Sequence, residues 1–191
     1  MHTGRMHPAL LYRPGPLLSD AELRAMRMDG VVFEVGDAFL PADVPETADA
    51  RLLSLASHLR DEHVVCGTTA AWVHGAGDRR PPRCHVRPHV PRRLRAPSDA
   101  DVVLHEGVVP PAEIRVISGI RILTVPATLV DLARSERDAE SRTWLLALLE
   151  REPAEVSPAI DLLRARERLP GKRRAIAALE SGYDEVTRYT S

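Results

Sequence analysis

Two runs of alternating apolar residues in the second half of the chain are joined by only two residues. EIRVI (113–117) leads through Ser118 and Gly119 into IRILTV (120–125). A two-residue link that contains glycine, placed between alternating runs, indicates a β-hairpin. The earlier runs CHVRPHV and DVVLH are also typical of strands. The sequence therefore predicts one small antiparallel or mixed sheet.

Helical patterns lie on both sides of these strands. Ser19 and Glu22 have the spacing of a capping box, which predicts a helix that Gly30 ends. Thr68 is a candidate cap for the helix TTAAWVH, and Thr124 is a candidate cap for the helix PATLVDLAR. Further helices are predicted over residues 45–62, 68–74, 138–152, 158–168 and 172–181. These patterns predict an α+β fold, in which helices pack on a small antiparallel or mixed sheet and the C-terminus is helical.

The N-terminal part has an organisation of its own. VVFEV and AFL flank Gly36 and Asp37, which predicts a short hairpin directly after the first helix. A helix followed by a hairpin is the closing half of a winged helix. We therefore expect a flexible, proline-containing arm over residues 1–18, a reduced winged-helix element over 19–44, and an α+β domain over 45–191.

The composition limits the classes of protein that need consideration. The chain has 191 residues, of which 44% are hydrophobic, and this is enough for one medium-sized domain. Only 4% are aromatic, which counts against a reader of single strands that stacks bases on aromatic rings. The sequence has no apolar run of membrane-spanning length and no secretory signal, so we expect a cytoplasmic protein without membrane contacts.

Residues 79–95, RRPPRCHVRPHVPRRLR, form a basic strip without a single carboxylate, although the whole chain holds 26 Lys+Arg and 27 Asp+Glu. Alternation in CHVRPHV predicts that Cys84 and Val86 face the core while the histidines and Arg87 face away. Pro88 cannot donate to a strand ladder, so we expect this strand to lie at a sheet edge or to pair only in part. The guanidinium groups repel one another, and a polyanion neutralises all of them together. The residues predicted to contact nucleic acid are Arg79, Arg80, Arg83, His85, Arg87, His89, Arg92, Arg93 and Arg95, together with Arg24 and Arg27 of the first helix.

Three interpretations of the strip remain open. Arginine contacts to duplex phosphates would give salt-dependent binding that is mostly independent of base sequence, while Arg87, Arg92 or Arg93 could contact base edges or a narrow minor groove. In the second interpretation, an acidic protein surface neutralises the same positive charge. An exposed, proline-containing loop without a partner is the third interpretation.

Other chemistry has little support in the sequence. The patterns of nucleotide-binding loops and of zinc sites are absent, and Lys172, the only lysine, lies in a predicted terminal helix, away from any carboxylate cluster that a nuclease would need. We therefore expect no enzyme, no catalytic residue, no metal site and no cofactor, with a metal-dependent hydrolase as the weakest alternative. Cys66 and Cys84 lack paired spacing and are predicted to be reduced, small core residues.

The order of three segments resembles the AbiEi-type family of antitoxins and transcriptional regulators. These segments are HVVCGTTAAWVHGAG, the basic CHVRPHVPRRLR, and DVVLHEGVVPPAEIRVISGIRILTVPATLVDLAR. The resemblance implies an N-terminal winged helix that binds operator DNA and a C-terminal α/β domain. In toxin–antitoxin members it also implies a nucleotidyltransferase toxin as partner. On this resemblance the wing is 31–40, the helix before it 21–28 and the basic strand 85–95. Some longer relatives continue into a Vsr-like nuclease domain, which we do not expect in this sequence.

The chain departs from the family pattern in three ways. The predicted wing carries Glu34 and Asp37, which weaken a phosphate contact. The helices that normally precede the recognition helix are either missing or collapsed into the proline-rich arm. The arginine that often precedes the threonine of PATLVDLA is absent.

Together these features predict a non-enzymatic, DNA-binding transcriptional regulator or antitoxin that holds double-stranded DNA through the arginines of the basic strip. The alternative is a protein-interaction module, a toxin-neutralising antitoxin that uses the basic strip on an acidic partner without binding DNA. The sequence leaves the oligomeric state open.

Overall fold

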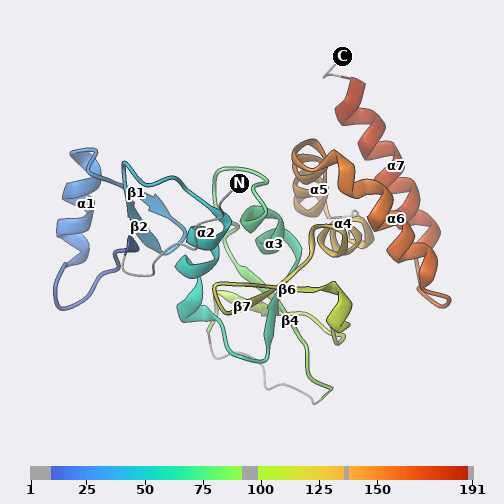
Figure 1. The fold of residues 1–191 in the computed structure, drawn as a ribbon, viewed down its shortest axis with the longest axis horizontal. Helices are drawn as coiled ribbons and strands as arrows, with labels where there is room; N and C mark the ends of the chain where they lie inside the picture. Colours follow the sequence, from blue (N-terminus) through green and yellow to red (C-terminus); the bar gives the residue numbers. More distant parts are fainter. Residues whose placement is uncertain (1–9, 92–98, 136–137, 189–191) are drawn as a thin grey trace.

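The structure is a computed structural model that describes residues 10–91, 99–135 and 138–188. Its fold is α+β, as predicted, with the N-terminal elements at one end and the C-terminal helices at the other (Figure 1). The N-terminal elements are helix α1 (Asp20–Met28) and the antiparallel pair β1 (Val32–Val35) and β2 (Ala38–Pro41). Ser19 and Glu22 form the predicted capping box of α1, which confirms the start of this helix.

The larger sheet is mixed and has the strand order β5-β4-β3-β7-β6. β3 runs parallel to β7, and β4 runs parallel to β5, while the other neighbours are antiparallel. The strands are β3 (His63–Val65), β4 (Cys84–Pro88), β5 (Val102–Leu104), β6 (Ile114–Ile117) and β7 (Ile120–Leu123). Ser118 and Gly119 join β6 to β7 with φ of 47° and 84°, so the predicted two-residue hairpin is confirmed.

Strand β4, which carries the centre of the basic strip, lies inside the sheet. The sequence placed it at an edge or in partial pairing because proline cannot donate to a strand ladder. The edge position is wrong, since β4 has β3 on one side and β5 on the other. The pairing is partial on the β5 side, because β5 pairs only with residues 84–86 and Pro88 lies beyond it.

Two helices, α2 and α7, differ clearly in length from their predicted ranges. The helix predicted over 45–62 is the short α2, which stops at Ser54, because Leu55 leaves helical geometry and the Ser54 hydroxyl donates to the Arg51 carbonyl. The last helix, by contrast, runs well past the predicted end at residue 181. The helices are α2 (Ala48–Ser54), α3 (Gly67–Val73), α4 (Val125–Arg134), α5 (Ala139–Arg151), α6 (Val156–Ala165) and α7 (Lys172–Arg188), with 3-10 turns η2 (Ala56–His58), η3 (Pro111–Glu113) and η4 (Pro153–Glu155).

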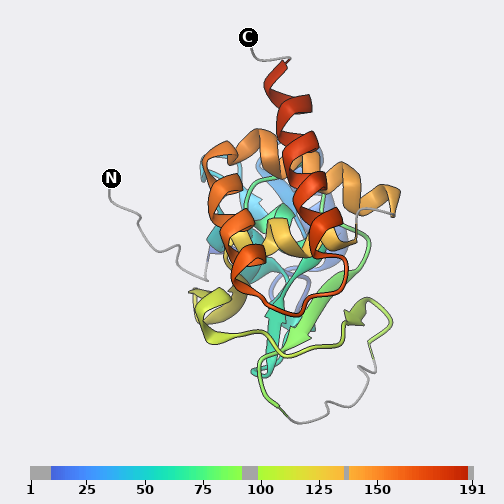
Figure 2. The same cartoon turned by 90° about the vertical axis from the view of Figure 1, so that its right-hand side faces the viewer.

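Two large hydrophobic clusters hold these elements together. The first joins the inner side of the β1–β2 hairpin to one side of the large sheet and to α2 and α3, and it includes Val35, Leu40, Trp72 and Val86. It therefore runs across the domain boundary predicted between residues 44 and 45, and that boundary stays a prediction. The second cluster lies between α4, α5, α6 and α7. Figure 2 shows α6 and α7 side by side.

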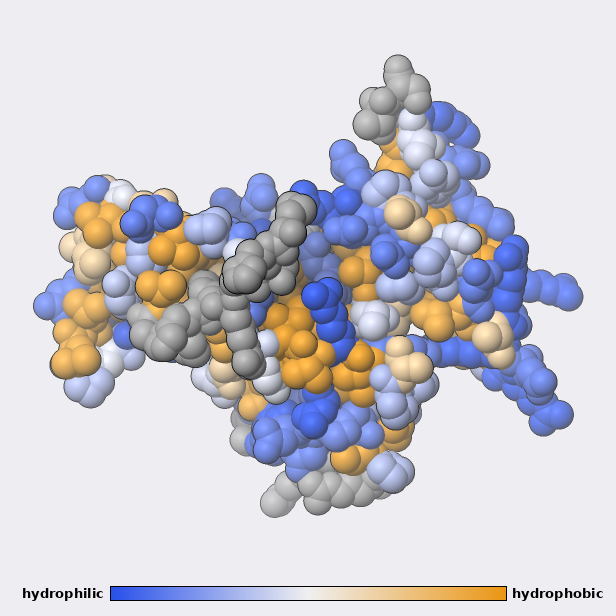
Figure 3. All heavy atoms as spheres, in the orientation of Figure 1, coloured by the Kyte–Doolittle hydropathy of each residue, from blue (hydrophilic) through white to orange (hydrophobic). Residues whose placement is uncertain are grey.

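The surface of the molecule differs in hydrophobicity from one part to another. On the face shown in Figure 3, hydrophilic residues cover much of the C-terminal helices, and apolar residues gather near the middle and on the N-terminal part. Among the described residues, no helix combines the length and hydrophobicity that crossing a bilayer requires.

Candidate nucleic-acid interface

The alternation predicted for β4 is confirmed. Cys84 and Val86 are buried in the first cluster, while His85 and Arg87 are half-buried on the opposite side. Because successive side chains of a strand point to opposite faces, the pattern CHVRP divides its apolar and basic residues between the two sides of the sheet.

Arg87 is held by the last turns of helix α4. One of its terminal nitrogens lies 2.6 Å from Oδ1 of Asp131, whose side chain is only 8% exposed. The other oxygen of Asp131 accepts from the backbone N–H of Gly67 at 3.0 Å. Thr68, the predicted cap of this helix, lies inside it instead, and Cys66 is the N-cap without a side-chain bond. Asp131 thus accepts a hydrogen bond from a backbone N–H in the first turn of α3, and its ion pair with Arg87 links α4 to β4.

Arg80 points to a different part of the molecule. One of its terminal nitrogens lies 3.0 Å from Asp37, at the tip of the β1–β2 hairpin. Asp37 also contacts Nε2 of His58 at 2.8 Å, and Asp99 contacts Nδ1 of the same ring at 2.5 Å. Burial lowers the pKa of His58, but its hydrogen bonds to Asp99 and Asp37 outweigh burial and raise the pKa above the ordinary value.

The basic strip is therefore not the single row of free cations that its sequence suggested. Arg80 pairs with the hairpin on one side of the sheet, and Arg87 pairs with α4 on the other. The sequence pattern could not show this, because both partners lie far away along the chain. A carboxylate that neutralises an arginine inside the fold leaves less charge for an external anion.

Arg79 and Arg83 differ from these two residues. Both are exposed at the approach to β4, and neither forms an ion pair within the described part of the chain. The predicted contacts Arg92, Arg93 and Arg95 lie outside the described residues.

The two histidines of the strip have internal partners. Nδ1 of His85 lies 3.0 Å from Nε2 of His105, so one ring donates to the other. Burial, reinforced by the neighbouring His105, lowers the pKa of His85 to about 4. Nε2 of His89 contacts the Asp61 carbonyl at 3.0 Å. His85 is therefore neutral at physiological pH and adds no positive charge to the strip.

The arginines of the N-terminal helix lie on an exposed surface. Arg24 pairs with Asp20 at 2.8 Å, and Arg27 lies 3.7 Å from Glu34 of β1. Exposed pairs of this kind stabilise a fold by about 0–1 kcal/mol, so a phosphate can replace the carboxylate at small cost. Glu34, noted as a departure from the usual wing, thus faces one of the predicted contacts.

Comparison with known proteins identifies the main part of the chain. The family model described as the AbiEi antitoxin C-terminal domain matches residues 63–179, which is more than half of the chain. The chain belongs to this family. The resemblance seen in the order of its sequence segments is thereby confirmed.

A solved structure gives a weaker comparison. The crystal structure of the RV2827C protein from Mycobacterium tuberculosis is similar at 21% sequence identity with a TM-score of 0.49. The match covers 85% of this chain and 65% of that protein, so the chain spans less than two thirds of its length. A search of curated proteins found no match.

The cysteines of this AbiEi-family chain are buried, as predicted for small core residues. Burial and the nearby Asp131 raise the pKa of the Cys66 thiol well above its usual range, and burial raises the pKa of Cys84 to about 12. Both therefore stay in the unreactive thiol form at neutral pH. Within the described ranges, no group of three or more His, Cys, Asp and Glu side chains is arranged to hold a metal ion.

Sequence reasoning missed three charged residues near Arg87. They are Asp131 and Arg134 of α4 and Arg166 at the end of α6. One signal was available for the first two, because they stand three apart in LVDLAR and thus share a side of an otherwise apolar helix. Nothing local in the sequence marked Arg166 as their neighbour.

Proposed function

We propose that this AbiEi-family protein is a non-enzymatic antitoxin and transcriptional regulator that binds duplex DNA through the arginines that its own carboxylates leave free. Antitoxin membership rests on the family match over residues 63–179. The DNA contact rests on one observation, the exposed and unpaired state of Arg79 and Arg83 at the approach to β4. We propose a nucleotidyltransferase-type toxin as the protein partner, because the resemblance to toxin–antitoxin members implies one.

The internal ion pairs refine the set of predicted DNA contacts. Arg80 and Arg87 are committed to Asp37 and Asp131, and we assign them the role of fixing β4 in place. Arg79 and Arg83 then supply direct phosphate contacts, and Arg24 and Arg27 add contacts by exchanging weak surface pairs for phosphates. Arg92, Arg93 and Arg95 remain predicted contacts.

The test is duplex binding by fluorescence anisotropy across a salt series. The double variant Arg79→Gln/Arg83→Gln should bind more weakly than the wild type, and its log-log salt slope should fall by about 2, because each lost phosphate contact removes roughly one counterion. Arg173→Gln, which removes an exposed arginine of α7, is the matched control and should leave both quantities unchanged. Equal affinity and equal slope in the wild type and the double variant would end this proposal.

A second function is favoured by the same ion pairs. Because Arg80 and Arg87 are already neutralised, fewer arginines are free in the described part of the strip, and a small acidic protein surface would neutralise Arg79 and Arg83. Size-exclusion chromatography of the protein expressed with its candidate toxin separates the two. A stoichiometric complex that is lost in Arg79→Gln/Arg83→Gln, from a protein that shows no salt-dependent duplex binding, would favour this alternative.

A further inference from the structure

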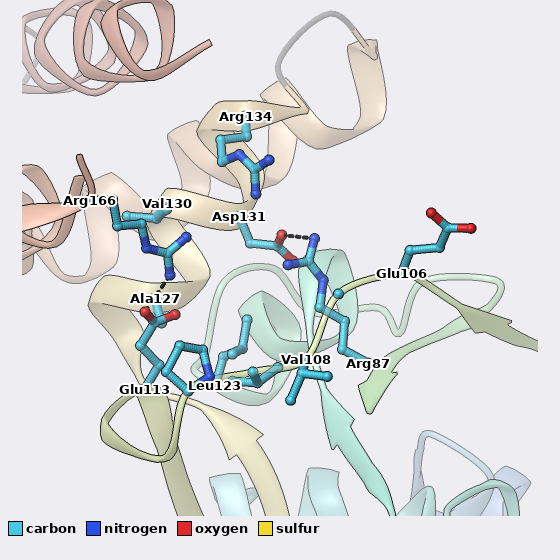
Figure 4. A pocket seen from close by; sticks show the side chains of 13 residues that line it. Arg87, Glu106, Val108, Glu113, Leu123, Ala127, Val130, Asp131, Arg134 and Arg166 are labelled. Atoms are coloured by element: carbon cyan, nitrogen blue, oxygen red, sulfur yellow. Dashed lines mark hydrogen bonds and ion pairs between the residues drawn. The ribbon is translucent and has the colours of Figure 1, made fainter. Parts of the chain in front are cut away.

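A cavity of about 270 Å³ opens beside Arg87, on the side of the sheet away from the hairpin. Its walls come from β4, the loop between β5 and η3, helix α4 and the end of α6 (Figure 4). Elements that are distant in sequence thus meet around one space. The family match assigns no ligand to it.

Three guanidinium groups from three different elements line this cavity. Arg87 comes from β4, Arg134 is the last residue of α4, and Arg166 caps the end of α6. Like charges placed this close repel one another, so the arrangement is unfavourable unless anions answer it.

Acidic residues of the cavity wall form ion pairs with two of these three arginines. Asp131 pairs with Arg87 and also accepts from the backbone of α3, and Glu113 pairs with Arg166. Glu106 also belongs to the lining, but its side chain is exposed and points away from the three arginines in Figure 4.

Arg134 is the third arginine of the cavity. It forms no ion pair with any residue that the structure describes, and its Nε is buried without a hydrogen-bond acceptor. The Nε of Arg87 is in the same state. A buried donor without a partner is rare in native proteins and points to an absent ligand or water. Burial and the charge of Arg87 lower the pKa of Arg134, and they outweigh the opposite effect of the nearby Asp131.

The rest of the lining is apolar. Val109, Leu123 and Ala127 are buried beneath the arginines, and the exposed Val108 lies at the rim. Ligand sites typically combine such an apolar wall with a few convergent polar groups. The volume is near the lower limit for small-molecule sites, which fits a compact ligand.

We propose that this cavity binds a small phosphate-bearing molecule, with the phosphate on Arg134 and on the unpaired Nε of Arg87 and the organic part against Val109, Leu123 and Ala127. A planar carboxylate accepts from one guanidinium fork, whereas the oxygens of a tetrahedral phosphate accept from donors that arrive from different directions. Arg166 adds positive potential at the side. The proposal does not depend on DNA binding.

The test measures thermal stability at constant ionic strength, in which sodium chloride is exchanged for inorganic phosphate or phenyl phosphate. Binding to the folded state raises the melting temperature, and a ligand at about 100 times its Kd should raise it by roughly 5–11 °C for a chain of this size. Arg134→Gln should lose this shift, and Arg134→Lys, which keeps the charge but loses the fork, should weaken binding about tenfold. Arg173→Gln should keep the full shift.

The apolar wall gives the experiment a second arm. Phenyl phosphate should bind more tightly than inorganic phosphate in the wild type, and Ala127→Ser should reduce that difference. Equal stabilisation of the wild type and both Arg134 variants would overturn the proposal, and so would an unchanged melting temperature at matched ionic strength.

Duplex binding distinguishes the source of the phosphate. Arg134→Gln should retain the affinity of the wild type for duplex DNA, because the ligand is a free small molecule. Loss of duplex affinity together with loss of the phosphate shift would mean that a backbone phosphate enters the cavity, which would overturn the assignment to a small ligand. Since Arg79→Gln/Arg83→Gln tests DNA binding separately, failure of either proposal can be recognised by itself.

Discussion

The two sides of the large sheet differ in how far their carboxylates neutralise the charges of the basic strip. On the hairpin side, Asp37 and Asp99 surround one arginine and His58, so carboxylates match the cations. On the α4 side, Asp131 is the carboxylate that serves Arg87, while Arg134 and two histidines lie close by. The first side has the composition of a structural contact, whereas on the second Arg134 has no carboxylate partner among the described residues. One stretch of sequence therefore contributes to two environments with different chemistry.

The hairpin side should tolerate change least, which a glycine substitution can test. Gly36 has φ of +56°, and a Cβ there would lie 2.1 Å from Ser54 Oγ and 3.3 Å from the Trp72 ring. Backbone strain and overpacking together predict that Gly36→Ala lowers the free energy of unfolding by about 4 kcal/mol. Urea denaturation measures this loss.

Gly30→Ala is the matched control for this prediction. Gly30 has φ of +73°, but a Cβ there meets no atom within 4 Å. Its substitution adds backbone strain alone, so we expect a loss of about 1 kcal/mol. Similar losses in the two variants would mean that the hairpin tip is not packed tightly against α2 and α3.

The α4 side should lose stability in acid. The pKa of His85 in the folded state, about 4, lies below its value in the unfolded chain, so the unfolded chain binds more protons between the two values. Stability from this site is complete above about pH 6.5 and falls toward pH 4, by about 2 kcal/mol after allowance for partial exposure. Denaturation midpoints over this pH range should fall less in His85→Gln. A His85 pKa above 6.5 by NMR titration would contradict the prediction.

The hairpin side should respond to pH with the opposite sign. His58 has a raised pKa, so its contribution is complete below the unfolded value near 6.5 and disappears as pH rises through the folded value. A charged hydrogen bond of this kind contributes about 1.5 kcal/mol. The stability difference between the wild type and His58→Gln should therefore be largest near pH 5.5 and smaller at pH 9. A difference that stays constant over this range would show that the His58 ring contributes by packing alone.

Local signals in the sequence were sufficient for much of the fold. The capping box at Ser19 and Glu22 and the Ser118–Gly119 hairpin act between neighbouring residues, and both are present as predicted. The end of the helix predicted over 45–62 was wrong because Leu55 belongs to the apolar face but leaves helical geometry to pack in the core. The spacing of apolar residues along the sequence cannot by itself distinguish a buried helical residue from a buried residue just after a helix.

The site was less accessible to sequence reasoning, for a physical reason. Exposure, alternation and charge density are local properties, and they placed His85 and Arg87 correctly on one side of β4. Neutralisation depends on residues that the fold brings in from elsewhere, such as Asp37 for Arg80 and Asp131 for Arg87. A cluster of positive charges in a sequence therefore indicates that anionic groups neutralise it in the functional protein. It does not show whether these groups are the protein's own carboxylates or belong to a ligand.

The hydrophobic cluster shared by the hairpin and the sheet has a consequence for how this protein can be divided. The family match begins at residue 63, yet Val35, Ala38 and Leu40 cover the sheet residues Val65 and Val86. A fragment cut at the start of the match would present that apolar surface to water, where it would favour self-association. The family match is therefore shorter than the unit that buries this cluster, and we expect a fragment that avoids self-association to begin before the hairpin.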